Sequence, residues 1–234
     1  MAIYKNTPPL STNGLLLYND FGSAISYPRS GNTVFNLMNT TALTGSFFNN
    51  PIFINREGGS SLNFVSNSLH YVGYGNPSSL QIVSGSIGVL AFITDRNVDY
   101  GINSGYHGLV VKGSAYSIFV YSNRLGFYDW GNGTLRDSGI TIGDNSWKYI
   151  TMNFTDISGT PSNNATFYIN GIPVWRTTVR LQSQTVQLAL GWNPGGTDQY
   201  FSGQIANFHL YNRVLSEQEI QQNYNALKSR FNLS

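Results

Sequence analysis

The sequence predicts an all-β domain in which two antiparallel sheets stack as a sandwich, with one amphipathic helix at the C-terminus. Three observations predict this fold. Short apolar segments with two-residue alternation recur between turns rich in Gly, Asn and Ser. A helical period occurs only after Ser216, and no long linker divides the 234 residues. Stacking two sheets is the usual way for so many antiparallel strands to bury their apolar faces.

The amino-acid composition favours β-strands over exposed helices and argues against some classes of binding partner. Aromatic residues make up 14% of the chain and charged residues only 10%, which suits strands joined by tight turns better than exposed helices. The net charge of +2 is spread without a basic run, so we expect no nucleic-acid partner. The chain has no cysteine, which excludes disulfides and thiolate metal sites.

The N-terminal region is expected to lie outside the packed domain. Residues 1–13 contain Pro8-Pro9 and polar residues, too few to form a core. This arm is either disordered or extended against a neighbouring subunit. It lacks an apolar signal-peptide core, and no segment has the apolar length of a membrane span, so we expect synthesis in the cytoplasm and no membrane insertion. The domain itself is predicted over residues 14–234.

Three features locate the central strands and hairpins. Residues 87–94 form the longest apolar run, which is typical of a strand at the centre of a sheet. Ser122-Asn123 and Asn170-Gly171 each separate two strand-like segments, and Asn-Gly supplies the positive φ angles of a type I′ turn. Pro173 places the strand after the second turn at an edge or a bulge.

The end of the chain changes from strand to helix. Ala206, Phe208 and Leu210 alternate with polar residues, whereas Ile205 is out of phase and predicts a bulge. Ser216 followed by Glu219 forms a capping box, which predicts a helix over about residues 216–229. Its apolar stripe consists of Ile220, Tyr224, Leu227 and Phe231.

Six parts of the chain carry a family resemblance. They are residues 14–20 with 26–28, 61–64 with 71–72, 145–150, 167–171, 190–192 and 201–220. Together they resemble the laminin-G-like group of the concanavalin A-like lectin/glucanase fold, over roughly residues 14–231. This resemblance implies a curved antiparallel jelly-roll β-sandwich.

The two ends of the domain resemble a narrower group. The opening Leu-Tyr-Asn-Asp at 17–20 and the segment 223–233 are similar to stand-alone domains in the structural proteins of tailed bacteriophages. This implies a virion location, as a capsid-decorating or tail-associated protein. The implied partners are other virion proteins, copies of this chain, and the host surface with its glycans.

The same resemblance raises the question of calcium. Family members often carry acidic residues in the closing block, where this chain has Ser202, Ala206 and Asn207. Those acids commonly help to hold calcium, so no calcium site is expected there. Asp20 remains as the candidate calcium ligand, and its alternative is a carboxylate that caps a turn. No other cofactor is expected.

Catalytic residues are not evident, although the fold also hosts glucanases. Glycoside hydrolysis needs two carboxyl groups that flank the bond. The Glu-x-Asp-x-x-Glu strand of the retaining enzymes is absent, because the three glutamates are Glu57 in a turn and Glu217 and Glu219 at the helix start. Asp95 and Asp99 follow the central strand and are interpreted as loop caps. The three histidines lie far apart, so we expect a protein that is not an enzyme.

Two loops could bind a ligand. Each sets an aromatic ring beside amides and glycine turns, which can stack a sugar and bond its hydroxyls. The alternative is that the two tryptophans pack the rim of the sandwich. The candidate residues are Tyr128, Asp129, Trp130 and Asn132 in one loop, and Trp192 and Asn193 in the other.

These observations lead to one functional hypothesis and two alternatives. The hypothesis is a non-catalytic β-sandwich that presents surface for protein–protein or host-surface contacts, and the resemblance implies that it does so on a phage particle. The first alternative is a carbohydrate-binding adhesin or lectin module. The second is a degenerate glycoside hydrolase.

Overall fold

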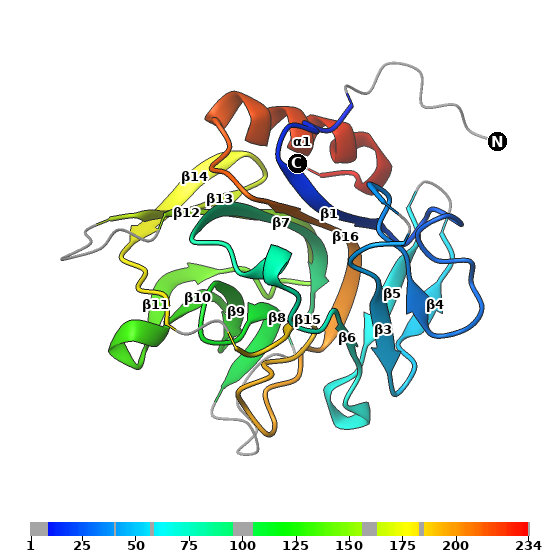
Figure 1. Cartoon of the computed structure of the whole chain (residues 1–234), viewed down its shortest axis with the longest axis horizontal. Helices are drawn as coiled ribbons and strands as arrows, with labels where there is room; N and C mark the ends of the chain where they lie inside the picture. Colours follow the sequence, from blue (N-terminus) through cyan, green and yellow to red (C-terminus); the bar gives the residue numbers. More distant parts are fainter. Residues whose placement is uncertain are drawn as a thin grey trace.

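The predicted sandwich of two antiparallel sheets is confirmed in a computed structural model of the chain (Figure 1). The structure describes residues 9–39, 41–56, 59–95, 105–155, 163–182 and 185–233. Among these residues, one α-helix is present, α1 (Glu217–Phe231), and it is too short and too polar to cross a membrane.

The first sheet, sheet A, has eight strands in the order β14-β13-β12-β7-β16-β5-β4, with β1 also paired to β16. The longest apolar run becomes β7, the middle strand of this order, as predicted. The strands are β1 (Leu15–Asp20), β4 (Ile52–Ile54), β5 (Ser61–Phe64), β7 (Ser84–Ile93), β12 (Ser146–Thr155), β13 (Ala165–Ile169), β14 (Ile172–Thr177) and β16 (Gly203–Tyr211).

The second sheet, sheet B, also has eight strands, in the order β11-β10-β9-β8-β15-β6-β3-β2. Three short 3₁₀ helices occur among the described residues: η1 (Ser66–Ser68) and η2 (Ser78–Leu80) lie in links between the two sheets, and η3 (Trp130–Asn132) lies within sheet B. The strands are β2 (Thr33–Val34), β3 (Gly45–Phe48), β6 (Tyr71–Gly73), β8 (Tyr106–Lys112), β9 (Ser117–Tyr121), β10 (Arg124–Asp129), β11 (Thr134–Thr141) and β15 (Leu188–Leu190).

Both predicted hairpins form. Ser122 and Asn123 join β9 to β10 with φ angles of 45° and 65°. Asn170 joins β13 to β14 with a φ of 52°, and its side-chain Oδ1 accepts a hydrogen bond from the Tyr149 amide at 3.0 Å. Pro173 lies on β14, at the edge of sheet A and beside a register shift, so it interrupts no inner ladder.

The bulge expected at the start of the last strand is present. The pairing of β16 with β7 shifts between Ile205 and Asn207. Ile205 therefore points into the core between the sheets, whereas Ala206 points to the opposite face under α1. The extra residue at the bulge thus lets β16 place side chains both in the core between the sheets and in the layer under α1.

The core lies between the two sheets and is rich in aromatic side chains. Its members come from both sheets and are almost fully buried, which supplies most of the apolar area that stabilises the fold. The fully buried phenylalanines of this core are Phe21, Phe64, Phe127, Phe154, Phe167, Phe201 and Phe208.

The C-terminal helix covers the outer face of sheet A (Figure 1). Its capping box forms as predicted: the Glu219 amide donates to Ser216 Oγ at 3.2 Å, and the Ser216 amide donates to Glu219 Oε2 at 3.0 Å. The helix continues to Phe231, two residues beyond the expected end. All four residues of the predicted stripe are buried, against the sheet residues Leu90, Tyr149, Ala206 and Tyr211 among others.

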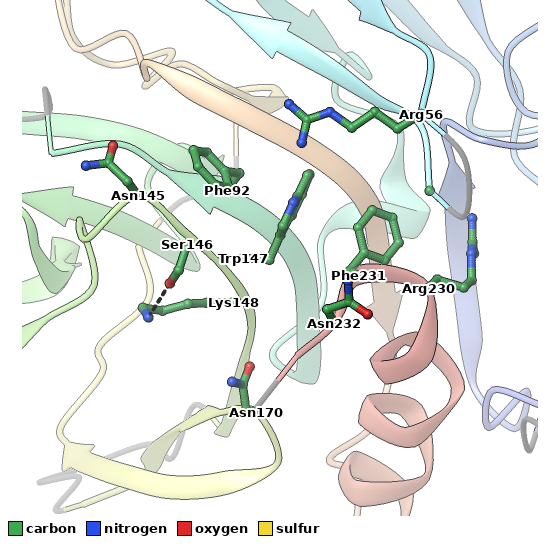
Figure 2. A pocket seen from close by; sticks show the side chains of 11 residues that line it. Arg56, Phe92, Asn145, Ser146, Trp147, Lys148, Asn170, Arg230, Phe231 and Asn232 are labelled. Atoms are coloured by element: carbon green, nitrogen blue, oxygen red, sulfur yellow. Dashed lines mark hydrogen bonds between the residues drawn. The ribbon is translucent and has the colours of Figure 1, made fainter.

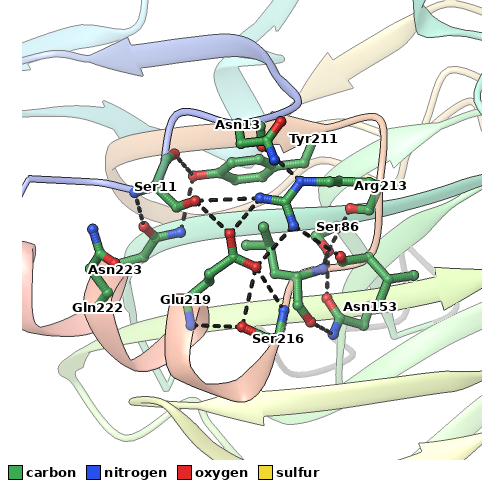
Figure 3. A network of polar contacts seen from close by, with 12 residues as sticks. Ser11, Asn13, Ser86, Asn153, Tyr211, Arg213, Ser216, Glu219, Gln222 and Asn223 are labelled. Atoms are coloured by element: carbon green, nitrogen blue, oxygen red, sulfur yellow. Dashed lines mark hydrogen bonds and ion pairs between the residues drawn. The ribbon is translucent and has the colours of Figure 1, made fainter.

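The end of the N-terminal arm is fixed to this same chain (Figure 3). The Ser11 amide donates to Asn223 Oδ1 at 2.8 Å, and the Tyr211 hydroxyl donates to the Ser11 carbonyl at 2.8 Å. Gln222 Nε2 on the helix donates to the Pro9 carbonyl at 2.6 Å. Residues 9–13 thus belong to the packed domain, and residues 1–8 lie outside the described residues.

An ion pair supports the same junction. Arg213, after β16, pairs with Glu219, and its Nε donates to the Asn13 carbonyl at 2.9 Å. The hydrogen bond from Arg213 holds the pKa of Glu219 well below its usual range. The Glu219 carboxylate therefore caps the helix, binds the arginine and accepts a hydrogen bond from Ser11 at 2.8 Å.

Candidate functional site

The outer face of sheet B differs from that of sheet A, because no α-helix covers it among the described residues (Figure 1). Alternation decides which side chains reach this face. In β3, Phe47 enters the core and Phe48 points outward with 41% of its surface exposed. In β9, Ile118 and Val120 enter the core, so Tyr121 points outward.

Four aromatic side chains form a continuous row on this face, which we call the aromatic row: Phe48, Tyr71, Trp192 and Tyr200. Phe48 and Tyr71 are paired across β3 and β6, and their rings stack at 4.2 Å and 3°. Tyr71 contacts Trp192 at 4.6 Å, and Trp192 stacks on Tyr200 at 5.6 Å and 13°. Tyr200 is buried, whereas Phe48 is exposed and Tyr71 and Trp192 are half-buried.

The loop that carries Trp192 is held close to the sheet. Trp192 and Tyr200 form an isolated antiparallel bridge, and Gly108 in β8 pairs with Tyr200. A Cβ on Gly108 would lie 2.6 Å from the backbone of Trp192, so only glycine allows this approach. Trp192 Nε1 donates to the Gly196 carbonyl at 3.1 Å, which fixes the indole.

A second aromatic group lies further along the same face. Tyr106 and Tyr121 are paired across β8 and β9, and their rings stack at 5.0 Å. Burial, followed by the nearby Tyr121 and Tyr128, raises the pKa of Tyr106, so its hydroxyl stays protonated at neutral pH. Arg124 lies over the Tyr121 ring at 5.6 Å and pairs with Asp137 at 2.6 Å.

The two loops predicted to bind a ligand lie together. The Trp130 ring is next to Gly195: a Cβ on that glycine would lie 3.6 Å from Trp130 Cη2. Trp130 also contacts Tyr128 at 4.5 Å. The Trp130 Nε1 atom is covered and has no hydrogen-bond partner among the described residues. Each tryptophan packs against a neighbouring tyrosine and keeps part of its surface exposed, so both interpretations stay predictions.

Asp129 has a different role from the one expected. Its side chain is fully buried, and its carboxylate accepts hydrogen bonds from Arg180 Nη1 at 2.7 Å and Arg136 Nη2 at 3.2 Å. The Arg180 amide adds a third at 3.1 Å. This corrects the grouping of Asp129 with Tyr128 and Trp130, because strand alternation turns it inward while Tyr128 points outward. The Asp129 carboxylate links β10 to Arg136 and Arg180 and is not available to a ligand.

The two candidate amides also differ. Asn193 is almost fully buried, and its Oδ1 accepts from the Gly195 amide at 3.1 Å while its Nδ2 donates to Gln199. It therefore shapes the Trp192 loop. Asn132 is exposed, and among the described residues its side chain bonds its neighbour Thr134 at 3.3 Å, so the amide stays accessible to a ligand.

Asp20, the candidate calcium ligand, takes part in an ion pair. Its two carboxylate oxygens accept from Arg230 on α1 at 2.6 and 3.1 Å, and the Gly22 amide donates to it at 2.9 Å. The turn-capping role is therefore present. Within the described ranges, no group of three or more His, Cys, Asp or Glu could hold a metal ion.

Other chemistry-bearing residues remain dispersed. His70 precedes β6, His107 is in β8 and His209 is in β16. Burial lowers the pKa of His209 to about 3, so this imidazole is neutral beneath the helix. Asp95 is exposed after β7, whereas Asp99 and Glu57 lie outside the described residues.

The sequence did not identify Phe48, Tyr71, Tyr121 or Tyr200 as site residues. Their alternation with core residues was visible, as in Phe47-Phe48 and Tyr71-Val72. The missing information was which sheet the helix covers, since that decides whether an outward ring is buried or open.

Comparison with known proteins agrees with this architecture. The family model described as the concanavalin A-like lectin/glucanases superfamily, of the Laminin_G_3 type, matches residues 70–221, more than half of the chain. The chain belongs to this superfamily. No curated protein sequence matches it significantly.

Several solved structures share the fold at low sequence identity. Trypanosoma rangeli sialidase has a TM-score of 0.66 and 13% identity, over 96% of this chain and 36% of the sialidase. The binding domain of Paraclostridial Mosquitocidal Protein 1 has a TM-score of 0.65 and 14% identity, over 91% of this chain and 52% of that one. The chain thus spans about a third to a half of these proteins.

A third structure is similar in size. Domain 4 of AbnA, a GH43 extracellular arabinanase from Geobacillus stearothermophilus, was solved in complex with arabinotriose. It has a TM-score of 0.58 and 13% identity, over 90% of this chain and 98% of that domain. At these identities the likeness shows a shared fold.

Proposed function

We propose that this domain binds carbohydrate on the outer face of sheet B. The observation that carries the proposal is the aromatic row, in which Phe48, Tyr71 and Trp192 keep exposed ring surface on a sheet without a covering helix. Isolated exposed aromatics are ordinary, but a contiguous group on a fixed scaffold is typical of a binding surface. The apolar face of a sugar ring can pack on such rings.

Polar groups beside the row would bond sugar hydroxyls. Burial, followed by the neighbouring Tyr200, raises the pKa of Tyr71, so its hydroxyl remains both a donor and an acceptor. Asn132 supplies an exposed amide near Trp130. The stacked arrangement fixes the rings before a ligand arrives, which lowers the entropy that binding must overcome.

The fold comparisons support this proposal over a purely structural role. The AbnA domain, which is similar in length, was solved in complex with arabinotriose, and the binding domain of Paraclostridial Mosquitocidal Protein 1 shares the fold. The virion role implied by the family resemblance gains no support from these comparisons and stays a prediction.

We further propose that the domain binds sugar without cleaving it. Hydrolysis needs two carboxyl groups beside the bond. Among the described residues near this face, Asp129 is turned inward and paired with arginines, and Asp137 is paired with Arg124. Asp198, in the loop between Trp192 and Tyr200, is then a single carboxylate beside the aromatic row among these residues, and one carboxylate does not supply the required pair.

Isothermal titration with neutral oligosaccharides tests the proposal. Arabinotriose and trimers of glucose, galactose and mannose form a first panel, followed by a glycan array. Trp192→Ala should weaken binding about twofold to tenfold, since a stacked ring contributes about 0.5–1.5 kcal/mol.

Ile172→Ala is the matched control. Ile172 is 63% exposed on β14, at the far edge of sheet A, and should leave affinity unchanged. An equal loss of affinity in Trp192→Ala and Ile172→Ala, or no binding of any glycan by the intact protein, would contradict the proposal. Thermal midpoints of both variants establish that they are folded.

A further inference from the structure

A second candidate site lies on the opposite side of the molecule. A groove of about 450 Å³ opens on the outer face of sheet A, where α1 ends (Figure 2). This volume is within the range of small-molecule sites. It is separate from the aromatic row, because β7, β12 and the helix end form its walls. The residues that line the groove include Arg56, Phe92, Asn145, Trp147, Lys148 and Arg230.

The groove has a positive lining. Three cations line it, Arg56, Lys148 and Arg230, and no carboxylate is among its lining residues. Lys148 and Arg230 each have a carboxylate partner beyond the groove, at 2.8 and 2.6 Å. Arg56 is exposed and has no such partner among the described residues. Figure 2 shows its guanidinium extending toward Trp147. A ligand carboxylate could therefore pair with Arg56.

The floor of the groove is aromatic. Phe92 contacts Trp147 at 5.7 Å, and Trp147 contacts Phe231 at 4.8 Å. Trp147 is half-buried, so part of its ring faces the groove. The amides of Asn145 and Asn170 also line the groove, where they can meet hydroxyl groups. This combination fits a ring that has an apolar face and hydroxyls on its edge.

The helix end does not cancel the positive charge. A helix C-terminus carries partial negative charge on its last carbonyls. Here the Leu233 amide donates to the Lys228 carbonyl at 3.1 Å, and Asn232 caps the end with a φ of 49°. Two basic residues, Lys228 and Arg230, also lie in the last turn and oppose the dipole.

We propose that this groove binds an acidic sugar, a pyranose ring that carries a carboxylate. The carboxylate pairs with Arg56, the apolar face of the ring packs on Trp147, and ring hydroxyls reach Asn145 and Asn170. This site is independent of the proposed neutral-sugar surface on sheet B, because the two use opposite outer faces of the sandwich.

The probe for this site is sodium glucuronate, compared with glucose at low salt. The readout is the Trp147 indole signal in ¹H–¹⁵N spectra, assigned with Trp147→Phe. Glucuronate should shift this signal in a saturable way, and glucose should bind far more weakly. Arg56→Gln should weaken glucuronate about tenfold, the value of one charge-assisted hydrogen-bonded pair.

Arg176→Gln is the matched control, because Arg176 is another exposed arginine, on the edge strand β14. It should bind glucuronate like the intact protein, and so should Trp192→Ala. Equal binding of glucose and glucuronate, or an unchanged affinity in Arg56→Gln, would overturn the proposal. Inorganic phosphate or benzoate binding as tightly as glucuronate would also overturn it, since the groove would then recognise charge or ring alone.

Discussion

The two outer faces of the sandwich carry similar side chains but differ in what covers them. On sheet A, Tyr149 and Tyr211 are fully buried beneath α1. On sheet B, Phe48 and Tyr71 stand on a sheet without a helix and keep exposed surface. Aromatic residues thus stabilise one face and are available to a ligand on the other.

This difference shows that the role of an outward aromatic ring is set by the element packed on it. Substitutions on the face of sheet A should lower the free energy of unfolding and leave sugar binding alone. Substitutions on the face of sheet B should do the reverse.

Leu227→Ala should lower the free energy of unfolding the most. Leu227 is 1% exposed and packs in the cluster between α1 and sheet A. Truncating a buried leucine to alanine costs about 2–5 kcal/mol, because transfer energy is lost and a cavity remains. Urea denaturation measures the change. A loss below about 1 kcal/mol would mean that the helix is only loosely attached.

His209 should make the helix-covered face sensitive to acid. Burial lowers its folded pKa to about 3, and it lies near Tyr149, Tyr18, Asp20 and Arg230. The unfolded chain binds a proton below about pH 6.5, which the folded chain resists, so stability falls as pH falls from 6.5 toward 3. Between pH 6.5 and 5 we expect a loss of about 2 kcal/mol.

The test of this pH dependence is the slope of stability against pH. His209→Gln removes this titrating group, and its slope over the same range should be much shallower even if the variant is less stable overall. The remaining slope belongs to His70, because burial lowers its pKa as well. An unchanged slope would assign the acid sensitivity to other groups.

Asp129→Asn should separate structure from binding within the candidate loop. Asp129 is buried and paired with Arg136 and Arg180, each of which keeps about a third of its side chain exposed and can be rehydrated. The loss should therefore be about 1–2 kcal/mol. Affinity for an oligosaccharide should stay unchanged in titration calorimetry; a large loss of affinity at full folding would show that the carboxylate reaches the ligand.

Ser216→Ala should have a smaller effect, on the start of the helix. The variant loses the side-chain acceptor for the Glu219 amide, and removal of such a cap costs about 1 kcal/mol. Thermal unfolding measures the change. Ser216→Asp retains a capping oxygen and should therefore keep most of the stability that Ser216→Ala loses.

Phe48→Ala should change stability least. Phe48 is 41% exposed and stacks on the neighbouring Tyr71. Its loss should cost less than about 1 kcal/mol of stability, the range of one aromatic pair. The same variant should bind oligosaccharide more weakly. A stability loss as large as that of Leu227→Ala would remove the distinction between the two faces.

Much of the fold could be predicted from the sequence, because its signals are local. The Asn170-Gly171 turn, the phase break at Ile205 and the Ser216–Glu219 box each specify backbone geometry within a few residues. All three are present in the structure. The expected end of the helix, at about residue 229, was too early, because the helix and its apolar stripe continue to Phe231.

The candidate site was less predictable, because it depends on contacts between distant segments. Trp130 and Gly195 meet only after β10 and the loop beyond β15 are folded. Asp129 follows Tyr128 directly, yet it faces arginines that lie 7 and 51 residues further along the chain. Arg56 and Trp147 share a groove that no spacing in the sequence indicates.

The most direct test follows the indole signals of the four tryptophans during titration with a neutral oligosaccharide that the protein binds. We expect Trp130 and Trp192, on the open side of sheet B, to shift with one common affinity. Trp147 and Trp175, on sheet A, should stay unchanged. Shifts confined to Trp147 and Trp175, or no shift of any indole by any glycan, would contradict carbohydrate binding on the face of sheet B.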